Sequence, residues 1–193
     1  MEGVTDFPMR KILTKHLPFT HCVAEFLRIN QVLPPDHVFL RHVPEMDLSQ
    51  CRTEVGTPVI FQILGGDAEK MAQAAQIAVR HGAQAIDINF GCPAPTVNRN
   101  DGGATLLKHP HRIYEIVKAV REAVAPEIPV SAKLRLGWDS VDPILRNAEE
   151  AARAGASWIT IHGRTKVQGY APPVFWKAIG DARKVVDVPV SQE

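Results

Sequence analysis

One cysteine, Cys92, stands in a turn rich in glycine and proline, directly after an apolar run that ends at Asn89. Such a thiol either packs as a small loop side chain or acts as a nucleophile that a neighbouring base activates. The histidines that could provide that base are His109, His111 and His162, yet no short spacing pairs any of them with the cysteine. The residue types therefore mark this turn as a candidate site and leave the role of the thiol open.

Polar side chains occupy one parity of successive apolar runs and gather toward the C-terminal end of each run. They are Gln62, Asp87, Asn89, Ser131, Lys133, Arg135, Thr160 and His162. Because alternate residues of a strand point to opposite faces, these side chains are expected to share one face and one pocket. Lysine inside a strand is costly unless it meets an anion, so Lys133 favours a binding site. Gln62 and His162 could instead satisfy interior hydrogen bonds, and Arg135 could be a solvated residue at the rim.

Six extended runs could position these residues, and segments of helical length lie between them. The expected strands are Cys22–Phe26, Thr57–Leu64, Gln84–Asn89, Val130–Leu136, Ser157–His162 and one that begins at Val188. A helix is predicted from an N-cap at Asp67 to a C-cap glycine at Gly82, and a second after Pro110. A third is predicted from an N-cap at Asp142, followed by proline, to Gly155. Strands that alternate with helices indicate a parallel sheet of βαβ units.

The chain is expected to form an α/β fold of the (β/α)8 TIM-barrel class. A flat sheet covered on both faces would be apolar on both parities, whereas a barrel presents reactive side chains at the C-terminal ends of its strands. A doubly wound sheet stays possible, but the G-x-G-x-x-G phosphate motif is absent after the first strand. A barrel takes about 250 residues. The 193 residues are therefore interpreted as one partial domain, residues 1–193, with strands 2–6 and the start of strand 7 of an incomplete barrel.

Composition limits the partners and the compartment. The chain is 45% hydrophobic and 22% charged with a net charge of +1, so any nucleic acid would have to meet a local basic patch. Its three cysteines form no metal-binding spacing, and their odd, sparse number favours a reducing compartment. No apolar run approaches the ~18 residues of a membrane span. We therefore expect a cytoplasmic protein with no metal site and no membrane contact.

These motifs, in this order, resemble the tRNA-dihydrouridine synthases over essentially the whole chain. The matching stretches run from Met1 to Asp6, Glu25 to Phe26, Gln62 to Leu64, Asp87 to Pro93, Gly102 to Ala104, Lys133 to Trp138 and His162 to Thr165. The stretch from Asp87 to Pro93, taken with Gly102 to Ala104, is the most specific of them. The Leu-Gly-Trp-Asp stretch after Arg135 favours the bacterial subgroup that modifies a single tRNA position.

The resemblance implies a flavoenzyme reaction. FMN, reduced by NADPH, would pass a hydride from its N5 atom to C6 of a uracil ring in tRNA, and a proton would have to reach C5. By its match to the family's cysteine, Cys92 would donate that proton. A cysteine thiol with a pKa of ~8.5 is mostly protonated at neutral pH. A base beside it would therefore be counterproductive, which accounts for the missing Cys–His pair. The uridine would also have to leave its stack to reach the flavin.

The same matches imply binding roles. The cofactor would be held by Met1, Glu2, Gln62, Lys133 and His162, the last three against the isoalloxazine ring. The substrate would be held by Asn89, which orients the uracil edge, and by Arg99, Arg135 and Arg164 around the mouth. Lys133 would stabilise negative charge on the reduced flavin. The partner would be tRNA, and the full-length protein is expected to be a monomer.

Two alternatives stay open. A flavin enzyme of the dihydroorotate dehydrogenase type would use a loop cysteine or serine as a base toward a small substrate. The other alternative is an inactive fragment that at most binds RNA weakly. It is based on Ser191-Gln192-Glu193, which departs from the family's Asn-Gly-acidic phosphate site, and on the expected absence of the C-terminal tRNA-binding helical domain. An incomplete barrel would also expose an unpaired strand edge.

Overall fold

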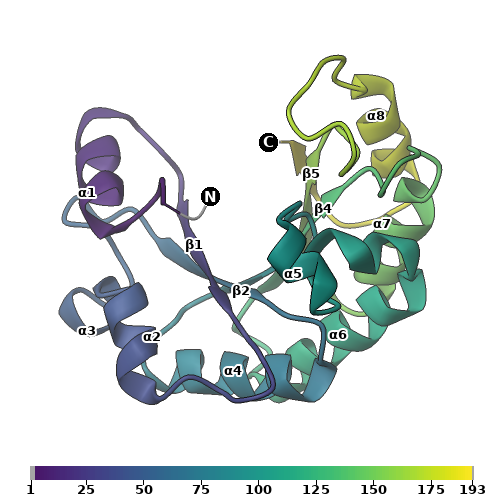
Figure 1. The fold of residues 1–193 in the computed structure, drawn as a ribbon. Coiled ribbons are helices and arrows are strands. Elements are labelled where there is room, and N and C mark those ends of the chain that lie inside the picture. The colour runs from purple at the N-terminus through teal and green to yellow at the C-terminus, as the bar shows by residue number, and fades with distance from the viewer. Residues whose placement is uncertain (1–2, 193) are drawn as a thin grey trace.

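The computed structural model describes residues 3–192, which form a curved, parallel, six-stranded sheet with helices along its outer side (Figure 1). The strands are β1 (Cys22–Arg28), β2 (Val59–Leu64), β3 (Ile86–Asn89), β4 (Val130–Arg135), β5 (Trp158–His162) and β6 (Val190–Gln192). Each strand pairs with the next one in the sequence, so the order in the sheet is β1 to β6. This order, with helical crossovers between parallel strands, confirms the predicted incomplete (β/α)8 barrel.

The two edges of the sheet are β1 and β6, which Figure 1 shows on either side of the open part of the curve. Within residues 3–192, neither edge pairs with a further strand. The concave face of the sheet, which would be the interior of a closed barrel, is therefore accessible from the gap between β1 and β6.

All six predicted strands are present, and most differ from the prediction only at their ends. β1 continues two residues beyond Phe26 to Arg28. β2 and β6 begin directly after Pro58 and Pro189, later than the sequence predicted. Proline has no N–H to donate to the neighbouring strand, so the regular hydrogen-bond ladder starts only after it. The apolar pattern alone does not show at which residue the hydrogen-bonded strand begins.

The strands alternate with helices, most of which cover the convex side of the sheet. Within residues 3–192 they are α1 (Phe7–His16), α2 (Asp36–His42), α3 (Glu45–Leu48), α4 (Ala68–Arg80), α5 (Pro95–Arg99), the 3-10 helix η1 (Gly103–Lys108), α6 (Pro110–Ala123), α7 (Ile144–Arg153) and α8 (Trp176–Lys184). The three helices predicted from the sequence correspond to α4, α6 and α7. In α4, the Asp67 carboxylate accepts the backbone N–H of Lys70 at 3.0 Å, and Gly82 follows the helix with φ +100°. Both predicted caps of α4 are therefore confirmed.

For α7, the predicted first residue is wrong by one position, and the predicted N-cap residue, Asp142, is also wrong. The helix begins at Ile144, and Pro143 precedes it as the capping residue without a side-chain hydrogen bond. The carboxylate of Asp142 accepts the hydroxyl of Ser140 at 2.5 Å instead of a helical N–H. The local Ser–Asp contact thus replaces the predicted N-cap. At the other end, Gly155 follows α7 with φ +97°, as predicted.

The segment after Cys92 is more ordered than a loop. It forms α5 and η1, and Val97, Leu106 and Leu107 are buried. Val97 packs with Phe26 and Leu64 in a small cluster that is separate from the main core. The turn that carries the cysteine therefore rests on its own apolar support.

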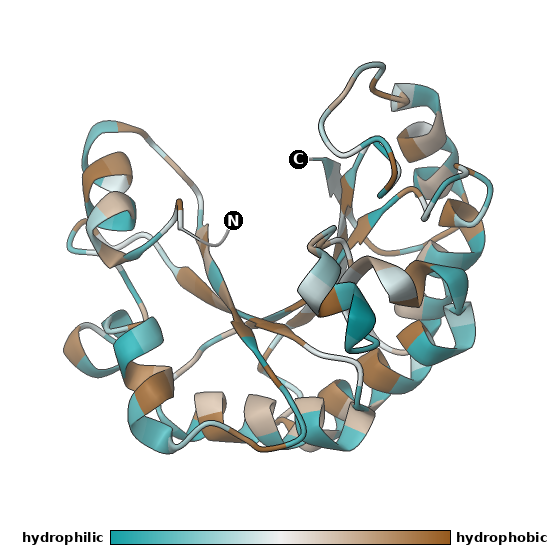
Figure 2. Ribbon diagram, viewed as in Figure 1, coloured by the Kyte–Doolittle hydropathy of each residue, from teal (hydrophilic) through white to brown (hydrophobic). Residues whose placement is uncertain are grey.

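The main core lies between the sheet and the helices on its convex side. Every residue of β2 is buried, as are Met71, Ala75 and Ala78 on the inner face of α4. Figure 2 shows hydrophobic colour along the strands and on the helix sides that face them, with hydrophilic colour on the outer sides. None of the helices within residues 3–192 is long and apolar enough to cross a membrane.

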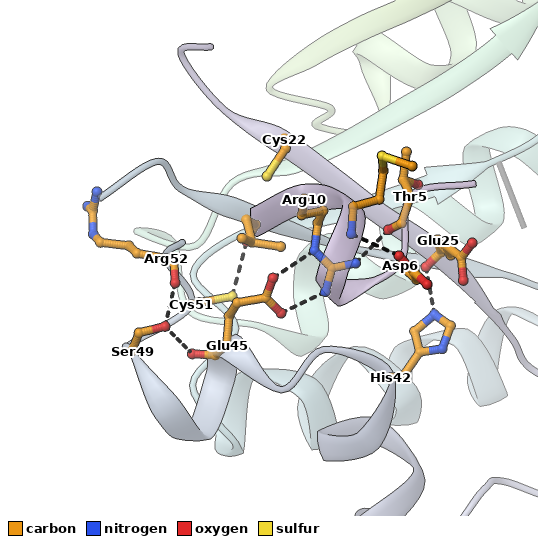
Figure 3. A network of polar contacts seen from close by, with 12 residues as sticks. Thr5, Asp6, Arg10, Cys22, Glu25, His42, Glu45, Ser49, Cys51 and Arg52 are labelled. Carbon is orange, nitrogen blue, oxygen red and sulfur yellow. Dashed lines mark hydrogen bonds and ion pairs between the residues drawn. The ribbon is translucent and has the colours of Figure 1, made fainter. Parts of the chain in front are cut away.

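A buried ion pair joins the N-terminal helix α1 to helix α3 (Figure 3). Arg10 of α1 donates from Nε and Nη2 to the two carboxylate oxygens of Glu45 in α3, at 2.7 and 2.6 Å. Its Nη1 donates to the carbonyl of Thr5 at 2.6 Å. The backbone N–H of Val4 donates to the carboxylate of Glu25 at 2.8 Å. These contacts hold the segment before α1 against β1.

Candidate functional site

A cavity of about 600 Å³ opens on the concave side of the sheet. Its walls come from all six strands, from the segments that follow β3 and β5, and from Thr5 and His21, which precede β1. The sequence-predicted residues that line it are Gln62, Asn89, Cys92, Lys133, Arg135, His162 and Arg164. Asp87 and Thr160, from the same polar parity, line it too. One parity of the strands thus converges on one pocket, as predicted.

The register of the sheet explains which of these side chains are neighbours. Asn89 lies opposite Lys133, and Lys133 lies opposite Thr160. One step further along the same face, Arg135 lies opposite His162. Residues at paired positions on one face of a sheet have adjacent side chains. The cavity is therefore built in layers, with amide, ammonium and hydroxyl groups below and guanidinium and imidazole groups above.

A chain of hydrogen bonds fixes the amide of Asn89. Its Nδ2 donates to Oε1 of Gln62 at 3.1 Å, and its Oδ1 accepts the backbone N–H of Gly91 at 2.9 Å. Gln62 in turn donates from Nε2 to the Asp87 carboxylate at 2.6 Å, and the Ser131 hydroxyl donates to the same carboxylate at 2.5 Å. All of these side chains are buried. Asp87 and Ser131 were not among the predicted site residues, although their parity in the polar pattern signalled them.

Gly103 allows the backbone to close tightly behind Cys92. The N–H of Ala104 donates to the Cys92 carbonyl at 3.1 Å. Gly103 has φ +58°, and a Cβ atom there would lie 2.8 Å from Val97 Cγ1 and 2.9 Å from the Cys92 carbonyl oxygen. Any side chain at Gly103 would therefore displace the turn. The half-buried Cys92 also packs against the apolar cluster that Val97 shares with Phe26.

The histidines do not supply a base for Cys92. Among the described residues, no hydrogen bond joins the thiol to an imidazole. His109 and His111 are exposed, lie outside the cavity lining and contact each other with ring centroids 6.0 Å apart. The nucleophile that an adjacent base would activate is therefore not supported by the geometry.

His162 lies in the cavity wall with a defined orientation. Its Nε2 is 3.1 Å from Nη1 of Arg164, whose Nε donates to the Ala171 carbonyl at 3.0 Å. A guanidinium has no acceptor, so the imidazole Nε2 is the acceptor in this contact. The ring also contacts Tyr170 at a centroid distance of 5.8 Å. Arg164 and Tyr170, which belong to the rim, therefore fix the orientation of the His162 ring.

Arg135 is not the solvated rim residue that its place near the strand end allowed. Its side chain is buried, with Nε 2.9 Å from the Gly91 carbonyl and Nη1 3.0 and 2.7 Å from the carbonyls of Thr165 and Gly169. The guanidinium thus joins the Cys92 turn to the loop after β5. Its placement favours a positioning role over contact with a solvent-exposed phosphate.

Of the three remaining predicted residues, one lies elsewhere and two fall outside the described residues. Arg99, at the end of α5, does not line this cavity and instead lines a second one. Met1 and Glu2, predicted to contact the cofactor, lie outside the described residues. Thr5 and Tyr170 line the cavity and were missed by sequence reasoning, because the loops that carry them have no periodic pattern.

Of the three cysteines, Cys92 should react fastest with a thiol reagent. Burial raises the pKa of the Cys22 thiol to about 11, so only about one Cys22 in a thousand would be a thiolate at pH 8. Burial also raises the pKa of Cys51, which donates to the Val59 carbonyl. Alkylation with iodoacetamide at pH 8, followed by peptide mass spectrometry, should label Cys92 at least about tenfold faster. Equal labelling of Cys22 and Cys92 would contradict this description of the site.

Comparisons with known proteins agree with this geometry. The family model for dihydrouridine synthases (Dus) matches residues 1–192. The chain is 47% identical over 191 residues to the tRNA-dihydrouridine(16) synthase of Neisseria meningitidis serogroup A, covering 99% of this chain and 57% of that protein. It is 46% identical over 191 residues to the tRNA-dihydrouridine(16) synthase of Escherichia coli K12, covering 98% of this chain and 60% of that protein. The chain thus spans less than two thirds of the length of these relatives.

A solved structure is similar in fold alone. A chain from Coccidioides immitis assigned as a deoxyribose-phosphate aldolase superposes with a TM-score of 0.50 at 12% identity. The match covers 90% of this chain and 71% of that one. At this identity the likeness supports the barrel architecture and says nothing about chemistry.

Proposed function

Because the chain belongs to the dihydrouridine synthase family, we propose that it reduces uridine to 5,6-dihydrouridine in tRNA, with FMN as cofactor and NADPH as reductant. The observation that supports this most directly is the shared cavity of Asn89, Cys92 and Lys133. By analogy with the names of its relatives, the proposed target is position 16 of tRNA. The chain would correspond to the catalytic domain, acting as a monomer in the cytoplasm.

The cavity suits a flavin ring in size and in chemistry. Its volume of about 600 Å³ falls within the roughly 300–1,000 Å³ of typical small-molecule sites. Gln62, Lys133 and His162 contribute amide, ammonium and imidazole groups from three strands of its wall. When bound, reduced FMN would supply the hydride that adds to C6 of the uracil ring.

The residues around Cys92 would perform the remaining steps. Asn89, whose amide is fixed by Gln62 and by the N–H of Gly91, would orient the uracil edge. Cys92 would give its thiol proton to C5. The S–H bond would break as the C5–H bond forms, and a thiolate would remain on Cys92. Among the described residues, no hydrogen bond joins the thiol to an imidazole or a carboxylate, which suits a proton donor better than an activated nucleophile.

Replacing Lys133 with methionine should weaken FMN binding about tenfold or more. The substitution keeps the side-chain length but removes a charged donor, and a hydrogen bond to a charged group contributes about 1.5–3 kcal/mol. The dissociation constant can be measured by titrating flavin fluorescence against protein. Reduced FMN should lose more affinity than oxidised FMN, because the reduced ring carries the negative charge that the ammonium stabilises.

Lys177→Met is the matched control, since this side chain lies on α8 and is 89% exposed. Its FMN affinity should equal that of the unaltered protein. If the unaltered protein itself fails to bind FMN, the proposed function is wrong. If it binds FMN and Lys133→Met binds equally well, the role assigned to Lys133 is wrong.

A further inference from the structure

A second cavity, of about 780 Å³, lies beside the first at the C-terminal ends of the strands. Its walls come from the end of β1 and the loop after it, from the β2–α4 loop, from the end of α5 and from α6. Three arginines line it, namely Arg28, Arg99 and Arg112. They come from segments far apart in the sequence, and only Arg99 was among the predicted site residues.

The carboxylates in this second cavity are already engaged. Asp101 forms an ion pair with Arg112, which also donates to the Gly66 carbonyl at 2.6 Å. Asp67 accepts the N–H of Lys70 as the N-cap of α4. Within residues 3–192, the guanidinium group of neither Arg28 nor Arg99 has a hydrogen-bond or ion-pair partner. The lining therefore carries three guanidinium groups against two carboxylates, and the guanidinium groups of Arg28 and Arg99 form no ion pair within residues 3–192.

The two cavities share a wall. Phe26 of β1 lines the first cavity, and Arg28, two residues later on the same face of the strand, lines the second. Two residues of a strand span about 7 Å. On the other side of the wall, Cys92 lines the first cavity, and Arg99, at the end of α5, lines the second. A ligand bound beside Cys92 could therefore extend over Phe26 into the second cavity.

We propose that the second cavity binds backbone phosphates of the RNA strand whose uridine enters the first cavity. Guanidinium groups match the geometry of phosphate oxygens and form paired hydrogen bonds with them. The amides of Asn30, Gln31 and Asn100 line the same cavity and suit sugar and phosphate oxygens. A nucleotide flipped into the first cavity leaves its neighbouring phosphates at the rim, which is where Arg28 and Arg99 lie. This inference rests on the proposed function, because it takes RNA as the substrate.

The double variant Arg28→Gln/Arg99→Gln tests the proposal. Its affinity for an unmodified tRNA transcript should be measured from about 50 mM to about 200 mM salt, together with that of the unaltered protein. The slope of log affinity against log salt should become shallower by about 1.4–1.8, which corresponds to two phosphate contacts at about 0.7–0.9 each. At the lowest salt the affinity should fall at least about tenfold. Arg28→Lys/Arg99→Lys should restore most of the slope, since it keeps both charges.

Arg41→Gln is the control, because Arg41 is an exposed arginine on α2 that lines neither cavity. Its salt slope should match that of the unaltered protein. An unchanged slope in Arg28→Gln/Arg99→Gln would overturn the proposal, and so would a failure of the unaltered protein to bind the transcript. Flavin titration separates this failure from that of the proposed function. If FMN still binds and the slope is unchanged, only the phosphate site is wrong.

Discussion

Replacing Cys92 with alanine should lower the rate of uridine reduction at least about 10²-fold and leave FMN binding unchanged. A positioned general acid contributes typically 10²–10⁴-fold to a rate, and a methyl group has no proton to donate. Among the described residues, Cys92 is the only titratable side chain of the turn after β3 that lines the first cavity. Single-turnover assays with protein loaded with reduced FMN and an unmodified tRNA transcript, followed by nucleoside mass spectrometry, would measure the rate.

Two further variants sharpen this result. Cys22→Ala should keep the rate of the unaltered protein, because Cys22 is half-buried in β1 and does not line the cavity. Cys92→Ser should fall between cysteine and alanine, because a hydroxyl keeps a proton but is a much weaker acid than a thiol. Full turnover by Cys92→Ala would show that the proton comes from another group or from water.

The barrel and its cavity were predictable because strand geometry is local. Alternate residues point to opposite faces whatever the rest of the chain does. The placement of Asn89, Lys133 and His162 on one parity was therefore enough to predict that they share a pocket. The order of the strands followed from the short helical crossovers between them. Strand ends were less well predicted. They depend on where the backbone N–H groups of one strand begin to donate to the carbonyls of its neighbour.

The positions of two arginine side chains could not be predicted from the local sequence pattern. The family resemblance implied the same role for Arg99 and Arg135, as substrate contacts at the mouth of the cavity. In the structure, carbonyls of Thr165 and Gly169 reach Arg135 from the loop after β5 and hold its guanidinium inside. The turn of α5 directs Arg99 to the other side of the wall, into the second cavity. Both outcomes depend on contacts between segments that are distant in sequence.

The N-terminal helix was missed for a related reason. Its attachment depends on Arg10 and Glu45, which are 35 residues apart and carry no local signal of their pairing. Each of the two side chains is only 2% exposed. Charged residues are almost never buried without a partner, so the pair is a condition for α1 to pack at all. Figure 3 shows Arg10 of α1 facing the carboxylate of Glu45 in α3.

Glu45→Gln should therefore lower the free energy of unfolding by about 3–5 kcal/mol, the usual cost of leaving one partner of a buried pair uncompensated. This is a large part of the ~5–15 kcal/mol that stabilises a typical domain. Urea unfolding followed by circular dichroism would measure it. Arg10→Met/Glu45→Met should be less destabilised than Glu45→Gln, because it removes both charges and keeps the volume.

The exposed pair Lys11–Glu54 provides the matched comparison. Its atoms are 2.5 Å apart, but its side chains are 47% and 64% exposed. Water screens such a pair, so Glu54→Gln should change the free energy of unfolding by less than about 1 kcal/mol. If Glu45→Gln were as mild as Glu54→Gln, burial of the Arg10 charge could not be what fixes α1. A loss confined to Glu45→Gln would instead show that this single ion pair holds the segment of Thr5 at the edge of the cavity.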